Sequence, residues 1–131
     1  MDFPATITDQ MGRSITLMQR PRRIVSLVPS QTELLAHFGL DAEVAGITKF
    51  CIHPDNWFRT KPRVGGTKQY DFEKIAALQP DLIIGNKEEN AQEHTEQLMS
   101  LYPVWMSDIY TLADALNMIG SVGEITGKTE Q

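Results

Sequence analysis

The sequence predicts an α/β domain with a parallel sheet flanked by helices, and three observations carry this prediction. Short apolar runs rich in β-branched residues recur along the chain, as expected for strands buried on both faces. Between them lie segments of roughly 8 to 15 residues with helical periodicity, which is typical of βαβ units with right-handed crossovers. The length of 131 residues fits a single domain.

Residues 1–20 are expected to form an entering β-hairpin. Two short β-prone runs, 7–9 and 14–17, flank a turn that contains Gly12. Glycine adopts positive φ at no steric cost, which suits a tight turn between antiparallel strands.

Residues 21–110 are expected to form the βαβ core. Predicted strands cover 24–28, 44–48, 81–85 and 104–106, with a short extended piece at 64–67. Helices are expected to begin at capping residues Ser30, Asp71 and Asn90, the first ending at Gly39 and the second before Pro80. Residues 50–61 have no clear period and are expected to form a long loop.

The last segment, 111–131, is expected to be a helix capped by Thr111. Its pattern stops in mid-course, which suggests that the chain once continued. The start of the chain has neither a charged n-region nor an apolar h-region, so no signal peptide is visible. A cytosolic protein and a chain that begins after a leader both stay open.

Composition excludes several classes of protein. A net charge of −5 and a pI near 5.1 argue against nucleic-acid binding, which needs a basic surface. No run approaches the roughly 20 apolar residues that a membrane span requires. The single cysteine, Cys51, excludes an internal disulfide framework.

The motifs that would indicate phosphate or metal chemistry are incomplete. The run 65–68, Gly-Gly-Thr-Lys, lacks the spacing of a phosphate-binding loop and is better interpreted as a turn. Cys51, His53 and Asp55 could supply metal ligands, but no second ligand pair follows at zinc-site spacing. A half-buried loop cysteine and histidine is the favoured interpretation.

Catalytic motifs are also lacking. Ser26 and Ser30 flank the first long strand without the elbow motif of a nucleophilic serine. Glu88 and Glu89 are sequence neighbours whose side chains point apart, so they do not form an acid–base pair. We therefore expect no enzymatic activity.

Polar, charged and aromatic residues follow the carboxyl ends of the predicted strands. Ligands of open parallel sheets bind outside the carboxyl ends of the strands. Those ends carry residues 29–31, 49–51, 66–70, 86–87 and 107–108, which combine aromatics, amides, hydroxyls and cations. Such an edge is suited to holding a ligand rather than transforming it.

Several runs resemble one known family. RIVSLVPSQTELL at 23–35 and VAGIT at 44–48, then VGG at 64–66 and DFEKIAALQPDLII at 71–84, are similar to cobalamin and ferric-siderophore binding proteins. These are the helical-backbone (class III) receptors of ABC importers. The resemblance implies a Rossmann-like lobe of the periplasmic-binding-protein fold. Family members join two lobes by one long helix and bind ligand between them, and residues 1–131 resemble the N-terminal lobe.

The resemblance implies the substrate-binding component of an ABC importer, which captures a metal chelate and delivers it to a membrane permease without needing a cofactor. A ferric siderophore, haem or a cobalamin-like corrinoid would be the ligand. Thr67 and Asn86 stand where cobalamin receptors tend to have tryptophans, so cobalamin itself is in doubt. Lys49, Lys68 and Lys87 are candidate partners for an anionic chelate, or else solvated surface lysines.

Two positions carry over from the family residue by residue. Phe50 matches an aromatic ring presented to ligand, and Glu73 matches a glutamate that docks against permease arginines. Glu73 would also stabilise its own helix by its place near the N-terminus.

We expect one wall of the binding cleft to be formed by residues at the strand ends, namely Phe50, Thr67, Lys68, Tyr70 and Asn86. The family implies a periplasmic or cell-envelope location, peripheral to the membrane. Two alternatives stay open: a cytosolic chelate- or corrinoid-processing enzyme, and a lone lobe that self-associates as an interaction module.

Overall fold

A four-stranded parallel sheet forms the centre of the computed structural model, which describes residues 3–49, 51, 54–66, 70–88, 90 and 92–127. The strands are β3 (Ile24–Ser26), β4 (Val44–Ile47), β5 (Leu82–Asn86) and β6 (Val104–Ser107), in the order β4-β3-β5-β6. The predicted parallel α/β sheet is therefore confirmed. Every neighbouring pair runs parallel, so the carboxyl ends of all four strands lie at one edge.

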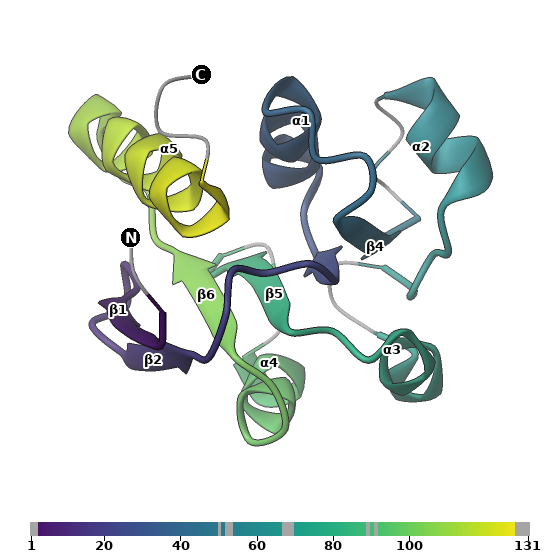
Figure 1. Cartoon of the computed structure of the whole chain (residues 1–131), viewed down its shortest axis with the longest axis horizontal. Helices are drawn as coiled ribbons and strands as arrows, with labels where there is room; N and C mark the ends of the chain where they lie inside the picture. Colours follow the sequence, from purple (N-terminus) through teal and green to yellow (C-terminus); the bar gives the residue numbers. More distant parts are fainter. Residues whose placement is uncertain are drawn as a thin grey trace.

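The N-terminal hairpin forms a separate two-stranded sheet, as predicted. Its strands β1 (Ala5–Thr8) and β2 (Ser14–Leu17) pair antiparallel. Gly12 lies in the turn with φ of +78°, the left-handed conformation that favours glycine. The turn lies beside the edge strand β6, where the N–H of Gln10 donates to the carbonyl of Met106 over 3.0 Å (Figure 1).

Helices cover both faces of the sheet (Figure 1). On one face lie α1 (Pro29–His37), α2 (Asp55–Thr60) and α5 (Leu112–Thr126), whose buried side chains pack with Trp57 and Trp105. On the other lie α3 (Phe72–Leu78) and α4 (Gln92–Met99), packed around Ile75 and Leu98. The sheet thus separates two apolar cores.

Of the four predicted caps, those at Asp71 and Thr111 are confirmed, the one at Ser30 is wrong, and the one at Asn90 stays a prediction, since residue 91, before α4, lies outside the described residues. Asp71 accepts hydrogen bonds from the N–H groups of Glu73 and Lys74, and Thr111 forms a reciprocal capping box with Asp114. Ser30 does not cap α1, because the helix already begins at Pro29 after an extended Val28. Proline has no N–H to satisfy and its φ is preset for the first helical turn.

The predicted long loop at 50–61 is also wrong, because it contains the short helix α2. Trp57 of this helix is 2% exposed, and its indole N–H donates to the Asp41 carboxylate. The ammonium of Lys61 lies 4.9 Å from the Trp57 ring centre and donates to the carbonyls of Asp41 and Val44. These contacts come from other segments, so six residues gain a helical conformation that their own pattern does not indicate.

Candidate functional site

The carboxyl edge of the sheet is the candidate site, and Asn86 is the predicted wall residue that the structure describes best. It is the last residue of β5 and is partly exposed. Its side-chain amide donates to Ser107 Oγ over 2.9 Å, and its Oδ1 accepts from the N–H of Glu88 over 3.0 Å. The backbone N–H of Asn86 donates to Asn90 Oδ1 over 2.8 Å. Among the described residues, Ser107, Glu88 and Asn90 thus hold Asn86 at the edge.

Ser107, at the end of β6, lies at the centre of a buried polar group. Gln31 of α1 donates through Nε2 to Ser107 Oγ over 2.6 Å and to the carbonyl of Gly85 over 3.0 Å. Ser107 and Gln31 are 0% and 1% exposed. We call Gln31, Gly85, Asn86 and Ser107 the Ser107 cluster; it joins one helix to two strands.

A second polar cluster lies where β3 and β4 end, around the single cysteine. Cys51 is fully buried, with the hydroxyls of Thr32 and Thr48 each 3.1 Å from its sulfur. Thr32 also lies 2.8 Å from the hydroxyl of Ser26. Burial keeps this thiol away from solvent, so its role here is packing and hydrogen bonding.

The metal-ligand interpretation of Cys51, His53 and Asp55 gains no support from the described part of the chain. His53 lies outside the described residues, and Cys51 is enclosed by hydroxyls. No group of three histidine, cysteine, aspartate or glutamate side chains among the described residues could hold a metal ion.

Of the other predicted wall residues, the structure describes only Tyr70. Phe50, Thr67 and Lys68 lie outside the described residues. Tyr70 is described, but only 6% of its surface is exposed, and its ring makes edge contacts with the rings of Phe72 and His94. Burial raises the pKa of the Tyr70 hydroxyl, and the nearby polar side chains of Thr95 and Asn90 partly offset that rise. The contribution of Tyr70 to a ligand site stays a prediction.

Cations lie at the same edge. Lys49 and Lys87 are both exposed, after β4 and β5 respectively. The Lys87 ammonium lies 3.6 Å from the Asp108 carboxylate, with about half of the Lys87 side chain exposed to solvent. Asp108 is only 15% exposed, so Lys87 neutralises a largely buried carboxylate while its own ammonium stays accessible to solvent.

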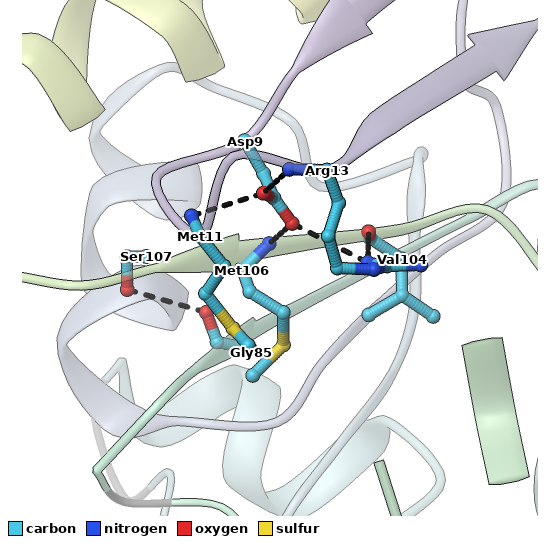
Figure 2. A network of polar contacts seen from close by, with 7 residues as sticks. All are labelled: Asp9, Met11, Arg13, Gly85, Val104, Met106 and Ser107. Atoms are coloured by element: carbon cyan, nitrogen blue, oxygen red, sulfur yellow. Dashed lines mark hydrogen bonds and ion pairs between the residues drawn. The ribbon is translucent and has the colours of Figure 1, made fainter. Parts of the chain in front are cut away.

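Next to Lys87 a hollow of about 220 Å³ lies between α4 and the hairpin turn. The thioethers of Met11, Met99 and Met106 contribute to its lining. Figure 2 shows the contacts that hold the turn: the Asp9 carboxylate accepts from the N–H groups of Met11 and Met106 and from Arg13. Sequence reasoning missed this arrangement, because no local pattern indicates that residue 9 meets residue 106.

Glu73 lies away from these groups, in the first turn of α3, and is exposed. The capping role belongs to Asp71, whose carboxylate accepts from the N–H of Glu73 over 3.1 Å. Within the described ranges we find no hydrogen bond or ion pair of the Glu73 side chain. Its carboxylate is thus presented to solvent from the first turn of α3.

Comparison with known proteins places this geometry in a family. The model of the family described as "Periplasmic binding protein" matches residues 24–131. The chain belongs to the periplasmic binding protein family. This family consists of binding proteins rather than enzymes, in agreement with the lack of catalytic motifs in the sequence.

Curated relatives of this periplasmic binding protein include importer components. The chain is 29% identical over 138 residues to an uncharacterized ABC transporter substrate-binding lipoprotein, YvrC, of Bacillus subtilis (strain 168), covering 98% of this chain and 43% of the relative. It is 30% identical over 95 residues to the vitamin B12-binding protein of Pectobacterium carotovorum subsp. carotovorum (strain PC1). That match covers 72% of this chain and 34% of the relative.

Solved structures share the fold. The petrobactin-binding protein YclQ from Bacillus subtilis superposes with a TM-score of 0.85 at 23% identity, covering 96% of this chain and 46% of the other. The siderophore binding protein BauB, bound to two acinetobactin molecules and ferric iron, superposes with a TM-score of 0.83 at 20% identity. The match covers 97% of this chain and 47% of BauB. The chain thus spans less than half the length of these relatives. None of the helices in the described ranges is long and apolar enough to cross a membrane.

Proposed function

We propose that this chain acts as one lobe of the substrate-binding component of an ABC importer and that it captures a metal chelate at the carboxyl edge of its sheet. The observation that carries the proposal is the fixed Asn86 carboxamide at this edge, held by Ser107 and by the N–H of Glu88. A polar group fixed in advance loses little conformational entropy on binding. The importer components among the relatives support the same role.

The ligand class that we propose is a ferric siderophore, a haem or a cobalamin-like corrinoid. Relatives named for vitamin B12 and structures named for siderophore and haem binding support this class. Lys49, Lys87 and Lys68 supply positive charge for an anionic chelate. Phe50, Thr67, Tyr70 and Asn86 complete the proposed wall.

Titration of the chain with cyanocobalamin, haemin and ferric acinetobactin tests the ligand class, with tryptophan fluorescence and calorimetry as readouts. We expect one of the three to bind with saturation and to lose affinity when Asn86 is changed to Ala. Saturable binding that Asn86→Ala leaves unchanged would move the site away from this edge. Lack of binding by all three would refute the ligand class for this chain.

We further propose that Glu73 docks against a permease subunit. Its exposure, its position on the first turn of a short helix and the separate cap at Asp71 support this role. With this role we propose a location in the periplasm or cell envelope, peripheral to the membrane, which a relative named as a lipoprotein supports.

We also propose that a second copy of this chain binds to the exposed surface of α5. Leu112, Leu116 and Ile119 are 76%, 59% and 39% exposed, and their spacing places them on one side of the helix beside the exposed Tyr110. Exposed apolar stripes of this kind favour association. Light scattering at several concentrations should show a dimer that Leu116→Gln dissociates; a monomer at every concentration would refute it.

A further inference from the structure

The three polar partners of the Ser107 hydroxyl determine the orientation of the Asn86 carboxamide. Ser107 Oγ lies 2.6 Å from Gln31 Nε2, 2.9 Å from Asn86 Nδ2 and 3.2 Å from the carbonyl oxygen of Gly85. A hydroxyl has one proton to donate and two lone pairs that accept. The Gly85 carbonyl can only accept, so the Ser107 proton is directed to it in the arrangement in which both amides donate to Ser107.

Gln31 reinforces this assignment. Its Nε2 carries two protons, and two oxygen acceptors lie in range: Ser107 Oγ and the Gly85 carbonyl at 3.0 Å. The Met118 sulfur, at 3.7 Å, is a weaker acceptor. With Gln31 donating, Ser107 cannot use its own proton toward this amide, and the Gly85 carbonyl is the acceptor within reach of that proton.

The opposite end of the Asn86 side chain is also fixed. Its Oδ1 accepts from the backbone N–H of Glu88 over 3.0 Å. Rotating the carboxamide by half a turn would bring its NH₂ against the Glu88 N–H, which is a repulsive contact. Its oxygen would then face Ser107, which could donate to it only by giving up the hydrogen bond to the Gly85 carbonyl, so the flipped orientation is disfavoured.

We propose that Ser107 and Gln31 are positioning residues, which lock the Asn86 carboxamide in one orientation at the ligand edge. Both are buried, at 0% and 1% exposure, so they act through Asn86 rather than by touching a ligand. The lock itself follows from the hydrogen bonds, whereas its effect on ligand affinity rests on the proposed function. A fixed donor and acceptor pattern discriminates between ligands that match it and ligands that do not.

Side-chain amide NMR on the ¹⁵N-labelled chain tests the lock directly. Wild-type Asn86 should give one sharp pair of NH₂ signals with slow solvent exchange. Ser107→Ala should shift this pair and speed its exchange by about tenfold, the value for loss of roughly one net hydrogen bond. Ser107→Thr keeps the hydroxyl and should restore the wild-type signals. The NH₂ group of Asn117, on α5, is the internal control and should not respond.

Gln31→Met keeps the length of the side chain and removes both donors, and it serves as the second variant should Ser107→Ala fail to fold. It should broaden the Asn86 signals, because the Ser107 hydroxyl loses the donor that restricts its rotation. Asn86 signals that are unchanged in both folded variants would overturn the lock.

Binding of the three probes above then tests the consequence. For a probe that wild type binds, Ser107→Ala should weaken affinity by about three- to tenfold and Ser107→Thr should recover it. A freed amide with unchanged affinity would overturn the positioning role. A wild type that binds none of the probes would count against the proposed function alone, since the NMR result still decides the lock.

Discussion

The Asp9 carboxylate accepts a hydrogen bond from the backbone N–H of Met106 over 3.2 Å and thereby joins the N-terminal hairpin to the edge strand of the main sheet. The same side chain, 0% exposed, accepts from the N–H of Arg13 over 2.9 Å and lies 3.3 Å from its guanidinium. The hairpin thus satisfies backbone groups that an edge strand would otherwise expose.

Asp9→Asn should lower the free energy of unfolding by about 1–3 kcal/mol, because the new NH₂ group faces N–H donors in a buried place. Chemical denaturation measures this loss. Asp55→Asn is the matched control: Asp55 forms an exposed pair with Arg59, at 67% and 74% side-chain exposure. The control should change stability by less than about 0.5 kcal/mol. Equal losses in both variants would contradict the buried-carboxylate explanation.

Substituting alanine at two glycines should change the free energy of unfolding in opposite directions. A Cβ at Gly85 would lie 2.9 Å from both Asn90 Oδ1 and Met106 Sδ, so Gly85→Ala must displace the side chain that accepts from the Asn86 N–H. We expect a loss of about 1–3 kcal/mol. Gly120, inside α5, has open space at its Cβ position. Gly120→Ala should therefore stabilise the chain by up to about 1 kcal/mol. Thermal unfolding compares the two, and a stable Gly85→Ala variant would show that the edge can rearrange freely.

The buried hydroxyl of Tyr70 predicts a loss of stability in alkali. Burial raises the pKa of Tyr70 above its ordinary value of 10.0, so near and above that pH the folded state holds this proton more tightly than the unfolded state does. The associated stability is complete below pH 10.0 and declines as the pH rises toward the folded-state pKa. Tyr70→Phe should lack this decline. Chemical denaturation of wild type and Tyr70→Phe on either side of pH 10.0 measures the decline. If the free energy of unfolding changes with pH in the same way in both proteins, the burial effect is contradicted.

Glu73→Lys should lower uptake through the cognate permease while ligand binding and folding are preserved, because it reverses the charge of a solvent-facing docking group. Glu93→Lys is the matched control, since Glu93 is likewise exposed in the first turn of a helix, α4. Transport of a radiolabelled ligand into cells measures the difference. If both variants transport as wild type does, or both fail alike, the docking role of Glu73 is wrong.

The helix caps that were predicted correctly depend only on residues close by in the sequence. The caps at Asp71 and Thr111 are correct, because each depends on backbone N–H groups within three residues. The cap at Ser30 is wrong for an equally local reason, the proline one residue earlier, whose significance the pattern did not reveal. Helix α2 was missed because Trp57 gains its stability from Asp41, 16 positions away.

The sequence by itself determined the α/β class, the family and Asn86 as an edge residue, since these follow from periodicity, motif order and the end of an apolar run. Only the tertiary structure decided which residues meet Asn86. Gln31 and Ser107 are 76 positions apart, and they meet because β3, β5 and β6 lie side by side in that order. A hydrogen bond requires contact within about 3 Å, and for distant segments that contact is set by how the strands are ordered in the sheet.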